Sequence, residues 1–217
     1  MILALFDLDN TLIGGDSDYL WGQHLCDIGA VDREWFKREH DRYYREYLEG
    51  TLDIADFLRF QLAPLADNSL ATLMQWRDDY METRISPIIL PRARELVASH
   101  RHRGHLPVII TATNRFITEP IARELGVEHL IATEPAVSDE GFTGEVSGTP
   151  SYAQGKVSRL EQWLNGREES LHGSWFYSDS HNDIPLLERV DNPVAVDPDA
   201  VLREEATKRD WPIISLR

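Results

Sequence analysis

Several features are scarce or missing in this chain of 217 residues, and each absence excludes a class of protein. Cys26 is the only cysteine, so the chain forms no internal disulfide and no cysteine-based zinc site. A single cysteine in a helical pattern is typical of a small buried hydrophobe. The 22 Lys and Arg residues face 37 Asp and Glu residues, a net charge of −15. This charge argues against a nucleic-acid partner, because binders of the phosphate backbone usually carry a basic face.

Long apolar runs are missing too. No stretch approaches the roughly 20 apolar residues that cross a membrane. The apolar run at residues 2–6 lacks the basic region that precedes it in a secretory signal. We therefore expect a cytoplasmic protein with no membrane partner. Hydrophobic residues make up 42% of the chain and charged residues 27%, which is typical of a globular protein and excludes disordered and fibrous chains.

What the sequence does contain is an alternation of short apolar runs and helical patterns. The apolar runs predict strands at residues 2–6, 107–111, 175–178, 193–196 and 212–216. Helical periodicity between them predicts helices at residues 92–102, 119–125, 156–164 and 184–189. This alternation predicts an α/β fold with a Rossmann-like parallel sheet. Turn residues within 129–146 predict a hairpin or a pair of loops there.

Residues 14–82 interrupt this alternation. They contain no convincing strand and predict several amphipathic helices, broken near Gly29, Gly50 and Pro64. We predict that residues 14–82 form an α-helical cap, inserted into a core domain of residues 1–13 and 83–217. The cap carries 7 basic and 15 acidic residues, a net charge of −8. Its aromatic residues recur at helical spacing, which is typical of packing between helices.

Two acidic motifs follow predicted strands. Asp7 and Asp9 come directly after the first strand, and Asp179 and Asp183 follow the strand at 175–178. Ligands of an open parallel sheet bind beyond the carboxyl ends of its strands, so we expect the four carboxylates to share one pocket. Such carboxylates repel one another unless a cation binds, and oxygen donors favour Mg²⁺ over Zn²⁺. Taken alone, each motif is equally compatible with a helix N-cap or a solvated turn.

Two further signals suit a phosphate group. Thr111 closes an apolar strand and is followed by Ala112, so a hydroxyl and free backbone N–H groups lie at a strand-to-helix turn. Lys156 follows Gly155 at the start of a helical pattern, where it would balance phosphate charge if it lies near the site. Either residue alone is common without any function.

In this order, the four pieces resemble the motifs of the haloacid dehalogenase superfamily of phosphatases. Residues 179–187, Asp-Ser-His-Asn-Asp-Ile-Pro-Leu-Leu, resemble the Asp-Gly-x-Asn-Asp-x-x-Met-Leu stretch of its phosphoserine phosphatase-like members. A helical insertion after the first motif resembles their small cap, and the resemblance covers nearly the whole chain. The chain departs from the pattern at Ser178 and Ser180, where many members have glycine. Because serine is also small, we expect the tight turn to be kept.

The resemblance implies a catalytic cycle and a set of site residues. Asp7 would attack phosphorus to form an aspartyl-phosphate, and Asp9 would protonate the leaving alcohol and then activate water. Mg²⁺ would be held by Asp7, the Asp9 backbone carbonyl and Asp179. The other residues implied in the site are, as substrate contacts, Thr111, Ala112, Lys156 and Asn182 and, as supporting residues, Thr11 and Asp183.

The substrate is indicated by the cap. Asp16 stands where phosphoserine phosphatases have a Glu that contacts the substrate amino group, although it also suits a helix N-cap. Arg59 stands near the position that binds the substrate carboxylate in those enzymes, although it also suits a surface arginine. Residues 16–21 and 47–50 are similar to a subgroup often assigned as histidinol-phosphatases. Their substrate carries an amine and an imidazole but no carboxylate, which an acidic, aromatic-rich cap would bind.

We therefore predict a Mg²⁺-dependent hydrolase of a small phosphorylated metabolite, a monomer or a homodimer. The first expectation for its substrate is histidinol phosphate, in L-histidine biosynthesis. One alternative is a phosphoserine phosphatase or a phosphatase of broad specificity, which would share the catalytic residues. Another is a non-catalytic binding or regulatory module on the same fold.

Overall fold

The computed structural model describes residues 1–49 and 51–217, without the side chains of residues 47–49. Its centre is a six-stranded sheet in the order β3-β2-β1-β6-β7-β8, and every pair of neighbouring strands in it is parallel. The strands of this sheet are β1 (Ile2–Phe6), β2 (Leu106–Asn114), β3 (His129–Thr133), β6 (Ser170–Ser178), β7 (Asn192–Val196) and β8 (Ile213–Ile214). The predicted α/β fold with a parallel sheet is confirmed.

Different helices cover the two faces of the sheet. Successive side chains of a strand point to opposite faces, and β1 shows the division: Phe6 and Leu5 belong to two separate buried clusters. The helices on the Phe6 side are α5 (Pro91–His102) and α6 (Arg115–Glu124). Those on the Leu5 side are α7 (Gln154–Leu164), α8 (Ile184–Leu187) and α9 (Ala200–Lys208). Helix α9 was not predicted from the sequence.

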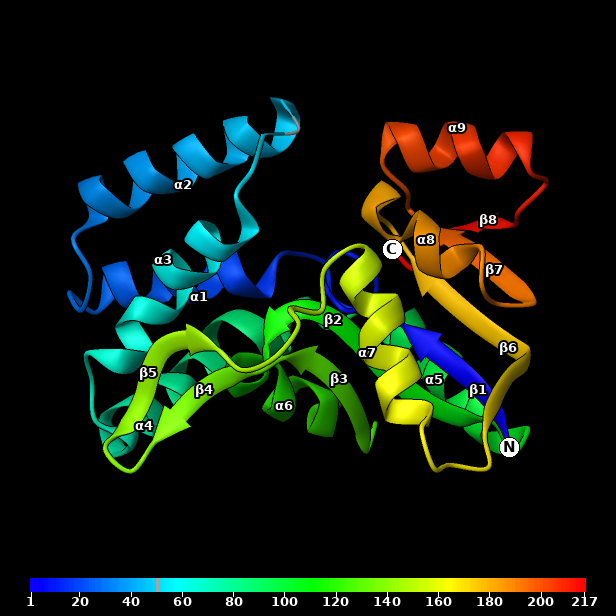
Figure 1. Cartoon of the computed structure of the whole chain (residues 1–217), viewed down its shortest axis with the longest axis horizontal. Coiled ribbons are helices and arrows are strands. Elements are labelled where there is room, and N and C mark those ends of the chain that lie inside the picture. The colour runs from blue at the N-terminus through cyan, green and yellow to red at the C-terminus, as the bar shows by residue number, and fades with distance from the viewer. Residues whose placement is uncertain (50) are drawn as a thin grey trace.

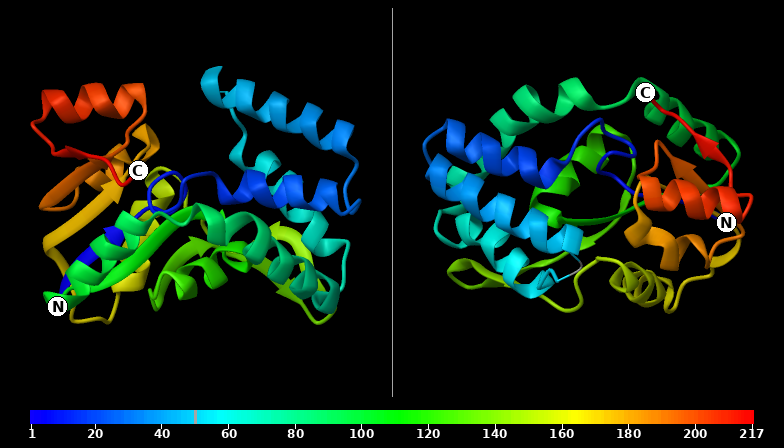
Figure 2. Two further views of the ribbon diagram at one scale, coloured as in Figure 1. Left: turned by 180° about the vertical axis from the view of Figure 1, so that it is seen from behind. Right: turned by 90° about the horizontal axis from the view of Figure 1, so that it is seen from above.

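The helical insertion lies on the side toward which β1 and β2 point (Figure 1). Its helices are α1 (Ser17–Asp27), α2 (Arg33–Glu49), α3 (Ile54–Ala66) and α4 (Leu70–Tyr80). In the view from above, these helices and the α8–α9 end of the chain lie at opposite ends of the molecule (Figure 2). Trp21 of α1 and Leu62 of α3 belong to the same buried cluster as Phe6. One continuous hydrophobic core therefore runs from the sheet into the cap.

The breaks between the cap helices partly follow the prediction. Gly29 lies between α1 and α2 with a φ of 74°, a left-handed conformation that glycine adopts at no steric cost. The break near Pro64 is also present, because α3 ends at Ala66, two residues after the proline. Pro64 itself lies in the last turn of α3, where it removes one backbone N–H from the helix. Gly50 lies outside the described residues.

Two adjacent linkers join the cap to the sheet. After α4 the chain forms a π-helical turn (Met81–Ile85) and a 3₁₀ turn (Ser86–Ile88), so the predicted cap boundary at residue 82 falls inside a helical turn. The Gly14 N–H donates to the Ile88 carbonyl at 2.8 Å, and the Leu90 N–H donates to the Leu12 carbonyl at 3.2 Å. These bonds pair the entering linker with the leaving one.

The segment 129–146 differs from the prediction in one respect. A hairpin does form, from β4 (Pro135–Ser138) and β5 (Gly141–Val146), but residues 129–133 form the edge strand β3, parallel to β2. The hairpin lies beside α3, and β5 packs against that helix (Figure 1). It is thus a contact between the core chain and the cap. Of the helices in the described ranges, none combines the length and apolarity that a membrane crossing requires.

Candidate active site

The turn after β1 carries two carboxylates to the carboxyl edge of the sheet. The Asp7 N–H donates to the Tyr177 carbonyl at 2.9 Å, which fixes Asp7 beside β6. The Leu8 carbonyl then accepts from three successive N–H groups of residues 11–13, closing a tight turn. Asn10 takes a left-handed φ of 56° within it, a conformation that asparagine adopts more readily than most residues. Asp7 and Asp9 both line the same cavity as a result.

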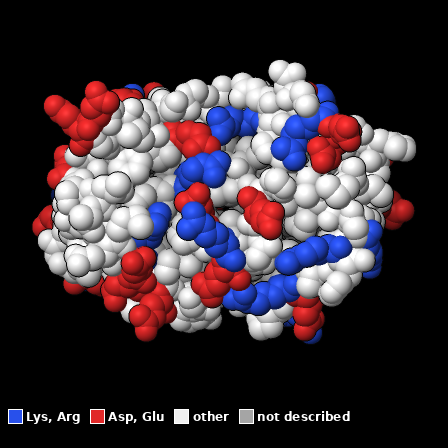
Figure 3. All heavy atoms as spheres, turned by 90° about the horizontal axis from the view of Figure 1, so that it is seen from below, with Lys and Arg blue, Asp and Glu red and all other residues white. Residues whose placement is uncertain are grey.

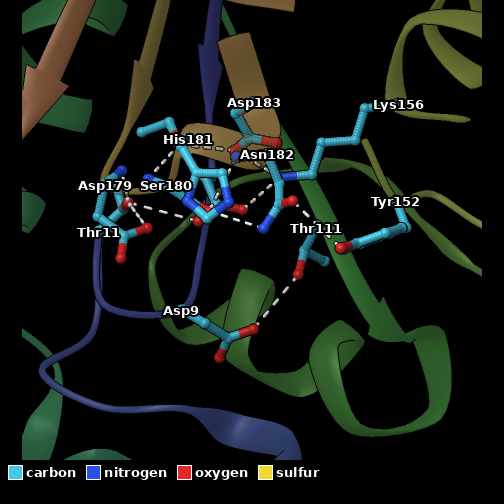
Figure 4. Close-up of polar contacts among 12 residues, drawn as sticks. Asp9, Thr11, Thr111, Tyr152, Lys156, Asp179, Ser180, His181, Asn182 and Asp183 are labelled. Atoms are coloured by element: carbon cyan, nitrogen blue, oxygen red, sulfur yellow. Dashed lines mark hydrogen bonds and ion pairs between the residues drawn. The ribbon is translucent and has the colours of Figure 1, made fainter. Parts of the chain in front are cut away.

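A buried ion-pair centre lies against this turn. Lys156 is only 4% exposed, and its Nζ lies 2.7 Å from Asp7 Oδ1 and 2.7 Å from Asp183 Oδ2. Burial raises the pKa of Asp7 to about 7, although Lys156 acts in the opposite direction. Burial alone would lower the pKa of Lys156, but Asp183 and Asp7 raise it above its ordinary value. The predicted meeting of Lys156 with the acidic motifs is present (Figure 4).

Gly155 explains how Lys156 reaches that position. A Cβ atom on Gly155 would lie 2.1 Å from the Pro150 carbonyl oxygen, a backbone atom that cannot move aside cheaply. The preceding Ala153 has a φ of 48°, a strained conformation for a residue with a side chain. The chain before α7 is therefore folded closely against itself, and glycine allows that approach.

The second acidic motif meets the first around one hydroxyl. Thr11 Oγ1 lies 3.4 Å from Asp7 Oδ2 and 3.3 Å from Asp179 Oδ1, and it accepts the Asp179 N–H at 3.1 Å. A single hydroxyl proton cannot satisfy two carboxylates at once. Burial, and then the charges of Asp7 and Asp183, raise the pKa of Asp179 to about 8. Lys156 pairs with Asp7 and Asp183, whereas Asp179 forms no ion pair within the described part of the chain.

The chemistry of these donors suits a hard cation. Carboxylate and carbonyl oxygens are the ligands that Mg²⁺ prefers, and it keeps several waters besides them. Within residues 1–49 and 51–217, no three His, Cys, Asp or Glu side chains are grouped so that they could hold a metal by themselves. The predicted Mg²⁺ set uses only two side chains, Asp7 and Asp179, with the Asp9 carbonyl and water, so it stays a prediction.

Both carboxylate oxygens of Asp9 are oriented by donors. The Ser17 N–H donates to Oδ1 at 2.7 Å, and the Thr113 hydroxyl donates to Oδ2 at 2.9 Å. Thr111 makes a longer contact of 3.5 Å with Oδ2 (Figure 4). Burial, and then the charge of Asp16, raise the pKa of Asp9 to about 6. The sequence analysis missed Thr113, although its spacing of two from Thr111 puts both on one face of β2.

The Ser17 contact belongs to a longer connection with the cap. The Tyr80 hydroxyl, on the last residue of α4, donates to the Ser17 carbonyl at 2.7 Å. Tyr80 and Ser17 are both fully buried. The backbone of Ser17 therefore links the cap to Asp9: its N–H donates to Asp9, and its carbonyl accepts from Tyr80 of α4.

The two serines that replace glycine in the second acidic motif have their own contacts. Ser178 Oγ donates to Asp183 Oδ2 at 2.6 Å. Ser180 Oγ accepts the Asn182 N–H at 3.2 Å and caps the short 3₁₀ turn His181–Asp183. Asn182 Oδ1 in turn accepts the Tyr152 hydroxyl at 3.1 Å (Figure 4). The tight turn is kept, and its hydroxyls hold the acidic loop in place.

These elements enclose a cavity of about 420 Å³ between the sheet edge and the cap. Its lining includes most of the predicted site residues, namely Asp7, Asp9, Asp16, Thr111, Ala112, Lys156, Asp179, Asn182 and Asp183. Asp16 is also the N-cap of α1, since it accepts the Tyr19 N–H at 2.9 Å. The carbonyl of Ala112 accepts the Thr133 hydroxyl at 2.7 Å.

The structure places Arg59 apart from the other predicted site residues. It is not among the described residues that line the cavity. Its side chain is half exposed and forms a surface ion pair with Asp56, one helical turn earlier on α3, at 3.4 Å. The face of α3 that turns toward the cavity carries Leu58 and Gln61 instead. Of the cap stretch at residues 47–50, the side chains of 47–49 and the whole of Gly50 lie outside the described structure.

Charges outside the cavity are mixed in sign. Seen from below, Lys and Arg side chains are interspersed with Asp and Glu side chains (Figure 3). Glu134, at the start of the hairpin, pairs with Arg115 of α6 at 2.8 Å and with Arg159 of α7 at 3.0 Å. These pairs attach the hairpin to the core helices.

Comparison with known proteins gives the following similarities. Residues 4–188 match the family model of haloacid dehalogenase-like hydrolases. The chain is 44% identical to a histidinol-phosphatase of Neisseria meningitidis serogroup C (strain 8013), and the match covers 99% of each chain. It is 31% identical to a phosphoserine phosphatase of Mycobacterium tuberculosis, covering 99% of this chain and 70% of that one.

Solved structures show the same architecture. A protein of unknown function from Bordetella pertussis Tohama I superimposes with a TM-score of 0.94 and 44% identity, covering 99% of this chain and 98% of that one. A substrate-bound phosphoserine phosphatase superimposes with a TM-score of 0.71 and 20% identity, covering 100% of this chain and 93% of that one. The second likeness establishes the fold alone.

Proposed function

The chain belongs to the haloacid dehalogenase-like hydrolase family and is a phosphatase, and from this premise we propose that it is a Mg²⁺-dependent histidinol-phosphatase that works through a phosphorylated Asp7. Its similarity over the full length to a histidinol-phosphatase supports this substrate. The observation that carries the proposal is the distribution of charge in the cavity. Such an activity would place the protein in L-histidine biosynthesis.

Among the described residues that line the cavity, Lys156 is the only Lys or Arg, and Asp7 and Asp183 already pair with it. A substrate carboxylate, such as that of phosphoserine, would need a further cation, because a buried unpaired charge is costly. A substrate with an amine and an imidazole but no carboxylate meets acidic and aromatic side chains from the cap instead. The charge pattern therefore favours histidinol phosphate over phosphoserine.

The first chemical step uses the two carboxylates of the β1 turn. Lys156 holds Asp7 Oδ1 in an ion pair, which leaves Oδ2 to attack phosphorus while the bond from phosphorus to the substrate oxygen breaks. Asp9 gives its proton to the leaving alcohol, and burial, which raises the pKa of Asp9, favours the protonated form that this step needs. Thr111, the Ala112 N–H and Lys156 orient the phosphoryl oxygens, and such positioning supplies most of the catalysis.

The second step returns the enzyme to its starting state. Asp9, now ionised, takes a proton from a water molecule that attacks the phosphorus of the aspartyl-phosphate. The bond between phosphorus and Asp7 breaks, which releases inorganic phosphate and restores the Asp7 carboxylate. The Thr113 hydroxyl can donate to Asp9 or accept from it, so it orients Asp9 in both protonation states.

Asp7, the Asp9 carbonyl and Asp179 would hold Mg²⁺, with Thr11 and Asp183 supporting these ligands from behind. The bound ion would supply the positive charge that offsets the clustered carboxylates and the phosphoryl oxygens. Asn182 would contact the substrate beside the acidic loop. We expect a cytoplasmic monomer or homodimer.

Phosphate release from a panel of phosphomonoesters tests the proposal. Histidinol phosphate, phosphoserine and p-nitrophenyl phosphate are compared with Mg²⁺ and with EDTA. We expect kcat/KM for histidinol phosphate to exceed that for phosphoserine by about a hundredfold. EDTA should abolish release, and excess Mg²⁺ should restore it.

Each other result of this experiment would support a different function. A preference for phosphoserine would assign the chain to that activity, and similar rates on every ester would make it a broad phosphatase. Mg²⁺ binding without release from any ester would favour a non-catalytic module. Release that survives EDTA would refute the Mg²⁺ requirement.

A further inference from the structure

The cap half of the cavity contains a carboxylate that the phosphoryl chemistry does not use. Asp18 lies in the first turn of α1 and lines the cavity. The side chain of Gln61, a residue of α3 that is only 6% exposed, interacts with this carboxylate and lowers its pKa, against the larger effect of burial. The Oδ1 atom of Asp18 is buried and has no hydrogen-bond partner in the described part of the chain. Two cap helices thus meet at one incompletely paired carboxylate.

The charges around Asp18 make this arrangement costly. Its nearest charged neighbours include Asp16 and Asp9, which have the same sign. Burial, followed by these two charges, raises the pKa of Asp18 well above its ordinary value. An ionised carboxylate removed from water needs a paired cation. Lys156, which the first acidic motif holds, is the sole Lys or Arg among the described lining residues.

The carboxylate of Asp18 is not needed to cap helix α1. A first-turn acid can stabilise a helix through its dipole, but the N-terminus of α1 is already capped by Asp16. Gln61, on the facing helix α3, also lines the cavity and interacts with this carboxylate. A partly buried acid with one unpartnered oxygen, beside a buried amide at a cavity wall, is suited to ligand binding.

Aromatic rings surround the same part of the cavity. Tyr19 and His40 line it with ring centroids 4.3 Å apart, and Tyr43 and Phe57 line it with centroids 5.3 Å apart. Aromatic faces attract cations and stack with flat rings. This environment would receive an organic cation beside Asp18, with its carbon skeleton or ring against the aromatic wall.

We propose that Asp18, beside Gln61 in the cavity wall, is the specificity-determining residue of this phosphatase and binds the ammonium group of an amino-alcohol phosphate. This inference rests on the proposed function and deepens it, because it assigns recognition of the amine to Asp18 rather than to the N-cap Asp16. The ammonium supplies the positive charge that the cap half of the cavity lacks. A phosphomonoester without a cation leaves Asp18 unpaired and gains nothing from it.

Two small esters that differ by one ammonium group isolate this contact. Phosphoethanolamine and ethyl phosphate are hydrolysed by the wild type, Asp18→Asn, Gln61→Leu and the control Asp67→Asn. Asp67 is an exposed acid at the end of α3, so its substitution removes the same charge from the cap outside the cavity. Histidinol phosphate is measured with each protein, and thermal unfolding verifies the fold.

The wild type should prefer phosphoethanolamine by about ten- to a hundredfold in kcat/KM, the range of a charge-assisted hydrogen bond. Asp18→Asn should bring this preference close to one, mainly by raising KM for the amine, while kcat/KM for ethyl phosphate stays within about twofold. Gln61→Leu should act in the same direction but less, and Asp67→Asn should not change the preference. The midpoint of unfolding of Asp18→Asn should not fall, since a poorly compensated charge is lost.

The outcomes separate this inference from the proposed function. An unchanged amine preference in Asp18→Asn overturns the role of Asp18, whichever substrate the wild type prefers. Equal loss of both esters in that variant, or a lost preference in Asp67→Asn, also overturns it. Loss of the amine preference in Asp18→Asn, in an enzyme that does not prefer histidinol phosphate, sustains the role of Asp18 and refutes the proposed substrate.

Discussion

The half of the cavity beside the sheet and the half beside the cap differ in how their charged groups are paired. In the core half, Lys156 lies 2.7 Å from each of two carboxylates, and both oxygens of Asp9 accept hydrogen bonds. In the cap half, Asp18 is incompletely paired and aromatic rings form much of the wall. Under the proposed function, the core half would bind the phosphoryl group that all phosphomonoesters share. The cap half would distinguish the alcohols to which that group is attached.

Substitution of the nucleophile should have the largest effect and should strike all substrates alike. In Asp7→Asn the neutral amide cannot attack phosphorus, so we expect kcat to fall by at least about a thousandfold for every ester. The measurement is phosphate release, and circular dichroism serves as the check on folding. Full activity in this variant would refute a phosphorylated Asp7.

Removal of the central cation should damage both catalysis and stability. Lys156→Met leaves Asp7 and Asp183 buried and repelling, so we expect the free energy of unfolding to fall by about 3–5 kcal/mol. We expect kcat to fall by about a hundredfold or more, because the phosphoryl oxygens lose a cation. Urea denaturation and phosphate release measure the two effects. Lys208→Met, at an exposed position of α9, is the matched control, and an equal loss there would contradict the role of the ion pair.

Substitution of Thr113, which contacts Asp9, should lower kcat by a smaller factor. Thr113→Val keeps the shape of the side chain but removes the donor to Asp9 Oδ2. Since a hydrogen bond to a charged group is lost, we expect kcat to fall by about ten- to a hundredfold, with KM within about twofold. Steady-state kinetics measure the split, with Thr207→Val on α9 as control. A change confined to KM would show that Thr113 contacts the substrate rather than orienting Asp9.

The smallest effect should come from a cap residue outside the cavity. Arg59 pairs with Asp56 on the surface of α3, and exposed ion pairs contribute little. We expect Arg59→Ala to leave kcat/KM for both histidinol phosphate and phosphoserine within about twofold. Competition between the two esters gives the most sensitive measurement. A selective loss of phosphoserine turnover would show that Arg59 binds the substrate, contrary to this prediction.

The sequence predicted the core half of the cavity well for a physical reason. Each side chain predicted to be catalytic follows a short buried strand or begins a helix, and parallel strands bring such positions to one edge. Asp7, Asp179 and Lys156 could therefore be grouped without coordinates. The parallel sheet followed from the alternation of elements, although β3 was taken for part of a hairpin because its five residues adjoin the turn signals of 134–141.

The cap half was much harder to predict. Which face of α3 meets the cavity depends on how α1 and α3 cross, and periodicity does not give that angle. Arg59 and Gln61 lie two residues apart on one helix, yet the first lies on the surface and the second is buried. Asp18 was overlooked for the same reason, since nothing local distinguishes it from Asp16. The partners of Asp9 on β2 and α1 likewise come from distant parts of the chain.

The bond from Tyr80 to Ser17, and from Ser17 to Asp9, has a consequence for protein engineering. Residues 14–82 look like an exchangeable cassette, yet Ser17 and Tyr80 both lie inside it and determine the orientation of Asp9 in the core. A chimera that imports a cap from another phosphatase would replace one of the donors that hold Asp9, the proposed general acid. A transplant that changes substrate choice without loss of turnover must therefore keep Tyr80, the Ser17 backbone and the paired linkers of the recipient.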